Sequence, residues 1–82
     1  MLVHVRLFAR ARDLAGTDML RVELPGGATV ADLRRRLAAD YPALSSLLAR
    51  SALAVENEFA GDSLVLSADA EVAFLPPVSG GI

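Results

Sequence analysis

Two stretches near the N-terminus alternate apolar and polar residues, LVHVRLFA at 2–9 and DMLRVEL at 18–24. An alternation with a period of two is typical of β-strands that bury one face and expose the other. The segment between them, ARDLAG, predicts one turn of helix that ends at Gly16. The first third of the chain therefore predicts two strands that pair as a hairpin with a long connection.

A capped helix follows this hairpin. The turn sequence PGG at 25–27 precedes Thr29, which can cap a helix together with Asp32 in a capping box. Pro42 predicts the end of this helix, and residues 42–50 predict a second, shorter one. The main helix carries an apolar stripe on one face, formed by Val30, Leu33, Leu37 and Tyr41.

The second half of the chain predicts three more strands. Residues 52–56 form the first of them, Asn57 and Glu58 form a turn, and residues 64–66 form a short strand or sheet edge. Residues 71–75 form the last strand, which ends before two prolines because proline cannot donate to a strand ladder.

This order of elements predicts the fold class. A hairpin followed by a helix that crosses to a later strand implies a mixed sheet with helices on one face. We therefore predict an α+β fold, with a mixed sheet of about five strands and one main and one short helix on the same face. The 82 residues suffice for a single domain, predicted at 1–75, followed by a tail at 76–82.

Composition excludes several classes of function. The chain has no cysteine, which excludes disulfides, thiolate metal sites and a cysteine nucleophile. Its net charge of −2 gives no basic excess for binding nucleic acid. No apolar run approaches the length of a membrane span, and the alternating N-terminus does not resemble a signal peptide. We therefore expect a cytoplasmic protein without nucleic-acid or membrane partners.

Side chains able to perform chemistry are few and isolated. The single histidine, His4, has no cysteine and no nearby carboxylate pair that could complete a metal site. Ser45 and Ser46 have no base near them in the pattern, so nucleophilic catalysis is unsupported. The three arginines at 34–36 point in different directions around a helix, which is typical of a solvated face. The chain predicts no self-contained active site, no metal site and no bound cofactor.

Three large apolar residues, Phe8, Phe59 and Leu75, allow two interpretations. In the first, Phe59 and Leu75 belong to the hydrophobic core. In the second, all three lie together on the open face of the sheet, where an exposed apolar patch marks a protein partner. The residue pattern alone leaves both interpretations open.

The tail PPVSGGI has an organised composition. Pro76 and Pro77 favour an extended exit from the sheet, and Gly80 and Gly81 have no side chains, so the segment could enter a narrow channel. Its reactive group would be the terminal carboxylate, which is inert until it is activated, for example by adenylation. All eight basic residues are arginines, so conjugation chemistry would use this carboxylate rather than a lysine amine of the chain.

Nearly the whole chain resembles the sulfur-carrier small subunit of molybdopterin synthase, a ubiquitin-like protein of the MoaD/ThiS family. The matching stretches are 5-VRLFARARDLAGTD-18, 28-ATVADLRRRL-37, 53-LAVEN-57 and 71-EVAFLPPVSGG-81. The last is the most specific, because it is a strand that runs into Pro-Pro-Val-small-Gly-Gly near the end of a short chain. The family often has Val-Asn where this chain has Val55-Glu56-Asn57, so the hairpin turn is expected to differ locally.

The resemblance implies a β-grasp fold and a role as a carried reagent. It implies that Gly81 is adenylated by a ubiquitin-activating-type enzyme using Mg-ATP and is then converted to a thiocarboxylate by a sulfur-donor enzyme. It implies that the tail inserts into the large synthase subunit, which supplies the catalytic side chains, and donates sulfur to a pterin precursor. The residues expected to insert are Pro76, Pro77, Val78, Ser79 and Gly80. By position, the family's partner-binding patch corresponds to Phe8, Phe59 and Leu75.

Ile82 departs from the family pattern, which ends at the second glycine. A β-branched residue at the terminus would put its own carboxylate at the reaction site. The first hypothesis is that a protease removes Ile82 before activation. Two alternatives are a sulfur carrier for another pathway, of the cysteine or thiamine type, and a non-reactive ubiquitin-like binding module in which Ile82 blocks activation.

Overall fold

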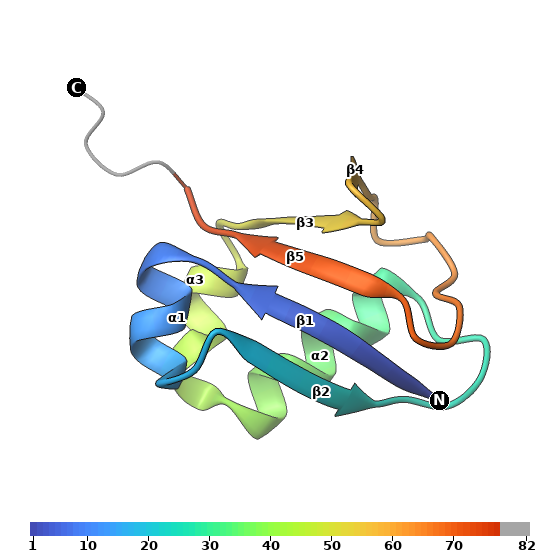
Figure 1. The fold of residues 1–82 in the computed structure, drawn as a ribbon, viewed down its shortest axis with the longest axis horizontal. Coiled ribbons are helices and arrows are strands. Elements are labelled where there is room, and N and C mark those ends of the chain that lie inside the picture. Colours follow the sequence, from blue (N-terminus) through green and yellow to red (C-terminus); the bar gives the residue numbers. More distant parts are fainter. Residues whose placement is uncertain (78–82) are drawn as a thin grey trace.

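A computed structural model describes residues 1–77 of the chain, which form a five-stranded sheet and three helices (Figure 1). The strands are β1 (Leu2–Leu7), β2 (Met19–Glu23), β3 (Ala52–Val55), β4 (Glu58–Phe59) and β5 (Glu71–Leu75). Their order across the sheet is β2-β1-β5-β3-β4, with β1 and β5 parallel and the other neighbours antiparallel. The mixed sheet predicted from the sequence is confirmed.

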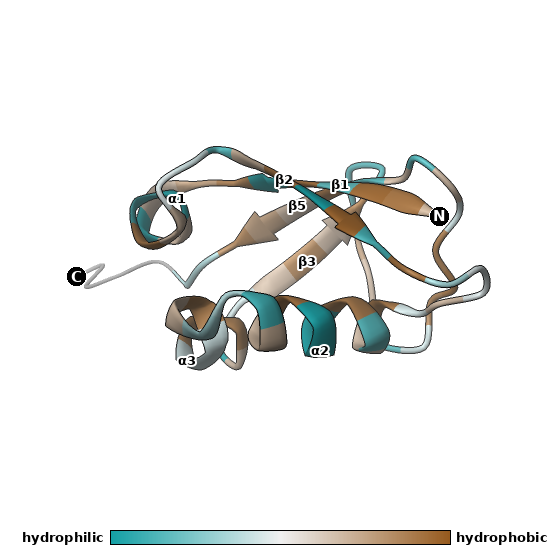
Figure 2. Cartoon of the chain, turned by 90° about the horizontal axis from the view of Figure 1, so that it is seen from below, coloured by the Kyte–Doolittle hydropathy of each residue, from teal (hydrophilic) through white to brown (hydrophobic). Residues whose placement is uncertain are grey.

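The second and third helices lie on one side of this sheet, and the first lies at one end of it (Figures 1 and 2). They are α1 (Ala9–Ala15), α2 (Val30–Asp40) and α3 (Ser45–Leu48), with a 3-10 turn, η1 (Pro42–Leu44), before α3. No helix within residues 1–77 covers the other side, which we call the open face. No helix in the same range is long and apolar enough to cross a membrane.

The core lies between the sheet and the helices. Its largest fully buried side chains come from strands and helices alike: Phe74, Leu7, Leu33, Leu37, Leu44, Leu53, Val3, Val5, Val30 and Val72. The apolar stripe of α2 thus packs on the face of the sheet that the strand alternation predicts. A mixed sheet with parallel central strands β1 and β5, curved around one main helix, is the β-grasp fold, as predicted.

Two boundaries near the N-terminus differ from the prediction, the end of the first strand and the start of the first helix. The first strand ends at Leu7 because Ala9, with φ of 49°, turns the chain into α1, which has seven residues rather than a single turn. Gly16 ends α1 in the left-handed conformation (φ 75°), as the sequence predicts. The short second helix is also present, as η1 followed by α3.

The turn predicted at Asn57 and Glu58 is wrong by one residue. The central residues of the turn are Glu56 and Asn57, with φ of 51° and 70°, and Val55 pairs with Glu58 across it. Positive φ at both central positions is the geometry of a type I′ turn, whose twist matches that of the flanking strands. The fourth strand is consequently β4, directly after the turn.

Residues 64–66, predicted as a short strand or edge, do not join the sheet. They make one isolated bridge, between Val65 and Thr29. The Leu64 carbonyl accepts from the Val30 amide at 3.0 Å, and the Leu66 amide donates to the Ala28 carbonyl at 2.8 Å. Because these backbone groups bond to the start of α2, they are not available to a strand.

Arg34 corrects the prediction of a uniformly solvated arginine face. Its guanidinium donates to the carbonyls of Leu48 at 2.8 Å and Ser51 at 3.0 Å, and to the Asp62 carboxylate at 3.1 Å. The side chain therefore ties α2 to the end of α3 and to the following loop. Arg35 and Arg36 are exposed, as predicted, and pair with acidic residues on their own helix.

The predicted capping box at the start of α2 is confirmed. Asp32 donates its amide to the Thr29 hydroxyl, and the Asp32 carboxylate accepts from the Thr29 amide at 2.9 Å and from the hydroxyl at 3.1 Å. The pKa of the Asp32 carboxyl lies below its ordinary value of 3.8. The main cause is the hydrogen bond from the Thr29 amide, and the second is the hydrogen bond from the Thr29 hydroxyl.

This capping box gives a pH-dependent stability. Because the folded chain binds the Asp32 proton less tightly than the unfolded chain, the stabilisation is complete above pH 3.8 and is lost as the pH falls through the lower, folded pKa. We expect Asp32→Asn to flatten the fall in urea midpoint at acidic pH. Asp13→Asn on the exposed surface of α1 is the control. Parallel pH curves for wild type and Asp32→Asn would contradict this account.

Candidate functional site

Alternation along β5 determines which side chains reach the open face. Val72 and Phe74 are buried in the core, so Glu71, Ala73 and Leu75 point to the opposite side. Ala73 lies between Arg6 on β1 and Ala54 on β3, its partners in the two neighbouring strands. The centre of the open face therefore has short side chains, which leave a hollow among longer ones.

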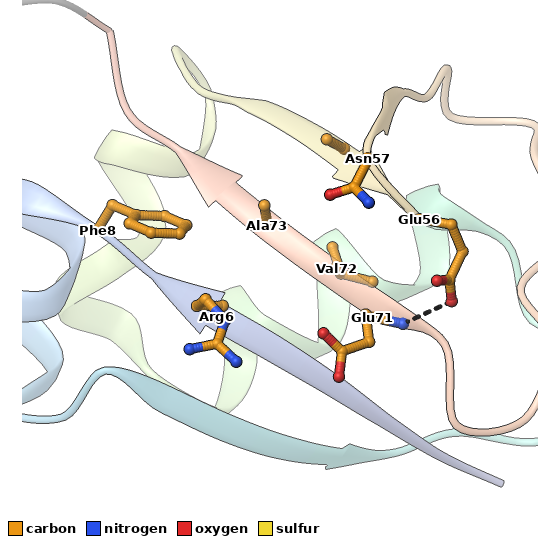
Figure 3. A pocket seen from close by; sticks show the side chains of 8 residues that line it. Arg6, Phe8, Glu56, Asn57, Glu71, Val72 and Ala73 are labelled. Atoms are coloured by element: carbon orange, nitrogen blue, oxygen red, sulfur yellow. Dashed lines mark hydrogen bonds between the residues drawn. The ribbon is translucent and has the colours of Figure 1, made fainter.

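The hollow is a recess of about 240 Å³, which we call the open-face recess (Figure 3). Ala73 and its partner in β3, Ala54, form the floor of the recess. Phe8 borders the recess at one end. Arg6 and Glu71 extend over it from neighbouring strands, and the turn with Glu56 and Asn57 closes the other end. The recess thus combines an apolar floor with charged side chains at its rim.

The type I′ turn fixes the acidic end of this recess. Glu56 accepts a hydrogen bond from the Glu71 amide through Oε1 at 3.1 Å, while its own amide donates to the Glu71 carbonyl at 3.0 Å. These two bonds hold Glu56 against the first residue of β5. Glu56 and Glu71 consequently lie at the same end of the recess, and the Glu71 carboxylate points from there toward Arg6 (Figure 3).

The three apolar residues predicted as core or patch have different burial. Phe59 on β4 is 79% exposed, so its assignment to the core is wrong. Phe8, in extended backbone directly after β1, is 40% exposed and lines the recess. Leu75 is half-buried and pairs with Ala52 on β3. The use of these residues for docking remains a prediction.

The tail begins where β5 ends. Leu75 is the last strand residue, Pro76 is half-buried and Pro77 is exposed. Since β5 lies between β1 and β3, the chain leaves the sheet at the end of a central strand (Figure 1). The predicted insertion residues Val78, Ser79 and Gly80, the predicted reactive Gly81, and Ile82 lie outside the described residues.

The remaining polar candidates are dispersed. His4 is half-buried on β1, and its Nε2 lies 3.7 Å from the carboxylate of the exposed Asp69. Ser45 and Ser46 are exposed at the start of α3, on the helical side of the sheet. Residues 1–77 contain no group of three or more histidine, aspartate or glutamate side chains placed to hold a metal ion.

Comparison with known proteins identifies the family of this chain. The model of the ThiS family matches residues 5–81. The chain belongs to the ThiS family. The family resemblance seen in the sequence is thereby confirmed.

Relatives of this ThiS-family chain match it over almost its full length. The molybdopterin synthase sulfur carrier subunit of Caenorhabditis briggsae is 40% identical over 81 residues, covering 96% of each chain. That of Arabidopsis thaliana is 35% identical over 79 residues, covering 96% of this chain and 82% of the relative. The crystal structure of SAMP1 from Haloferax volcanii superposes with a TM-score of 0.88 at 31% identity, covering 99% of this chain and 100% of that one.

Sequence reasoning missed the open-face recess of this ThiS-family chain. Alternation could have placed Arg6 and Glu71 on the open face, because both lie in strands whose core side is evident. Nothing in the sequence indicated that β1, β5 and β3 would align Arg6, Ala73 and Ala54 in one row. The register error at the turn also hid the position of Glu56.

Proposed function

We propose that this chain is a sulfur carrier that serves molybdopterin synthesis. The observation that carries the proposal is the near full-length identity, up to 40%, to proteins named molybdopterin synthase sulfur carrier subunit. Because the match spans the β-grasp domain and includes Gly80 and Gly81, it covers both the docking surface and the reactive end that such a carrier needs.

The proposed chemistry takes place at the carboxylate of Gly81. A carboxylate oxygen attacks the α-phosphate of ATP, pyrophosphate leaves, and an acyl-adenylate forms on an activating enzyme that binds Mg-ATP. Sulfide released by a donor enzyme then attacks the acyl carbon, AMP leaves with the bonding electrons of its ester bond, and a thiocarboxylate remains. The chain itself supplies the acyl group and binds no cofactor, while its partners supply the catalytic side chains.

The position of the tail on the fold supports delivery to a partner. Pro76 and Pro77 lack backbone N–H groups and therefore end strand pairing at the centre of the sheet. Residues 76–80 would then enter the large synthase subunit while the apolar surface of Phe8, Phe59 and Leu75 contacts that subunit. An exposed phenylalanine next to the tail exit is the type of anchor that protein interfaces use.

Ile82 requires a processing step in this proposal. Activation of the full chain would place the adenylate on a β-branched residue, whose two Cβ substituents crowd a channel suited to glycine. A protease that removes Ile82 would expose the Gly81 carboxylate. The full-length chain would then be a precursor.

We expect the variant that ends at Gly81 to gain the mass difference of one oxygen exchanged for one sulfur. The measurement is the intact mass after co-expression with the activating enzyme and a sulfur source. A variant that ends at Gly80 is the control, because it keeps the whole domain and lacks the reactive residue. If neither the full-length chain nor the Gly81 form ever gains sulfur, the proposal is wrong.

A second candidate is a protein modifier, favoured by the likeness to SAMP1, which is described as a small archaeal modifier protein. The same acyl-adenylate would then be attacked by an amine of a target protein, forming an amide and releasing AMP. The chain has no lysine, so it would act as the donor and not as a side-chain acceptor. Covalent adducts that survive thiol reductants, without a thiocarboxylate mass, would favour this function.

A further inference from the structure

The open-face recess has a size suited to one side chain. Its volume of about 240 Å³ lies below the range of about 300–1,000 Å³ typical of small-molecule sites. Its floor consists of two alanine methyl groups from adjacent strands, Ala54 and Ala73. An apolar floor of this kind accommodates the methylene stem of a long side chain.

The charged side chains around the recess are distributed unevenly between its two ends. Glu56 and Glu71 lie at one end, beside the type I′ turn, and Arg6 extends over the floor from β1 (Figure 3). Within residues 1–77, the Arg6 and Glu71 side chains make no ion pair, and Glu56 uses only Oε1, for the Glu71 amide. The two carboxylates therefore retain oxygen atoms that can accept hydrogen bonds from another molecule.

We propose that the open-face recess receives one arginine side chain of the large synthase subunit. This inference rests on the proposed function and specifies how that partner is recognised. The stem of the arginine lies on Ala54 and Ala73, and its guanidinium donates to the carboxylates of Glu71 and Glu56. The positive charge of Arg6 repels the guanidinium of the incoming arginine. The incoming guanidinium therefore approaches the carboxylates from the side away from Arg6.

Arginine suits this recess better than lysine or an apolar residue. A planar guanidinium can bond two carboxylate oxygens at once, and it can stack on an aromatic ring such as that of Phe8. An apolar side chain would bury the two carboxylates without partners, at a cost in binding. Exposed carboxylates contribute little in water, but the same contacts strengthen once a partner excludes water from them.

The test measures binding kinetics of the purified chain to the purified large subunit of its own organism. We expect Glu71→Gln to weaken binding about fivefold and Glu71→Arg about thirtyfold. The change should lie mainly in the dissociation rate, because the loss of a buried, hydrogen-bonded charge pair speeds dissociation. Asp40→Asn and Asp40→Arg are the matched controls. They make the same charge changes at the end of α2, on the helical side of the sheet, and should leave the binding unchanged.

A further variant, Ala73→Leu, tests occupation of the recess itself. The added atoms point to the open face, so the core is untouched, and we expect binding to weaken about tenfold because the floor is filled. Thermal unfolding verifies that each variant folds.

Three outcomes would overturn the inference while wild-type binding persists. Unchanged binding by both Glu71 variants excludes an arginine at this site, even if Ala73→Leu is defective. A change confined to the association rate that disappears in high salt indicates long-range steering instead of a seated side chain. An equal loss in the Asp40 variants indicates a general charge effect. If the wild-type chain itself does not bind the large subunit, the proposed function fails instead.

Discussion

Phe74→Ala is expected to lower the free energy of unfolding by about 3–5 kcal/mol, the typical effect of removing a phenylalanine from a closed core. Phe74 has no exposed surface and lies on the central strand β5, where its ring contributes to the packing between the sheet and the helices. Small domains are stable by only about 5–15 kcal/mol, so most of the stability would be lost. Urea unfolding followed by circular dichroism measures the change.

Phe59→Ala is the matched control for this stability prediction, because it removes the same ring from a position that is 79% exposed. We expect its free energy of unfolding to stay within about 0.5 kcal/mol of wild type, as is usual for surface substitutions. Similar losses of stability in the two variants would show that Phe59 contributes to the folding core after all.

The same Phe59→Ala variant is expected to weaken binding to the large synthase subunit about hundredfold, in agreement with the effect of a buried aromatic anchor at an interface. Phe59 lies in one row with Ala54 and Ala73, so a partner seated on the open-face recess would cover its ring. The measurement is the dissociation constant by titration calorimetry at constant salt.

Val65→Ala is the control for this binding prediction. Val65 is also a well-exposed apolar residue, at 60%, but it lies on the segment bonded to the start of α2 and outside the sheet. We expect this variant to bind like wild type. If Phe59→Ala also binds like wild type, the partner does not use the open face at β4.

The faces of the first strand, the end of α1 and the start of α2 could be predicted because they depend on residue types and on neighbours close in the sequence. The alternation in residues 2–7 identified both faces of β1, and Thr29 with Asp32 specified the start of α2 through bonds within four residues. Gly16 ended α1 for an equally local reason, its left-handed backbone conformation. In each case the information lies in the residue type and its nearest neighbours.

Other features depend on contacts between distant segments. Helix α1 has seven residues because the chain turns at Ala9, which has a positive φ. An alanine in the sequence gives no indication of such a backbone conformation. The turn at Glu56 and Asn57 follows from the pairing of β3 with both β4 and β5. Residues 64–66 resemble a strand by composition, yet their backbone bonds to residues near 28–30.

The candidate site was only partly accessible from sequence for the same reason. Phe8 was placed on the open face by continuing the alternation of β1 one residue beyond its end, and it lines the recess there. The open-face recess requires side chains from β1, β3 and β5, and the register between these strands joins residues 6, 54 and 73. The exposure of Phe59 became evident only when the turn was located, because a shift of one residue reverses the face of every side chain in a strand.

The central position of β5 also has a consequence for how the chain folds. This strand is the last one in the sequence, yet it joins β1, near residue 4, to β3, near residue 53. Contacts between the two ends of a sequence close long loops, which slows folding relative to proteins of local topology. A chain interrupted before Glu71 would leave β1 and β3 with unpaired inner edges, which are prone to aggregation. Completion of the C-terminal strand therefore controls both the folding of the domain and the presentation of the segment that follows it.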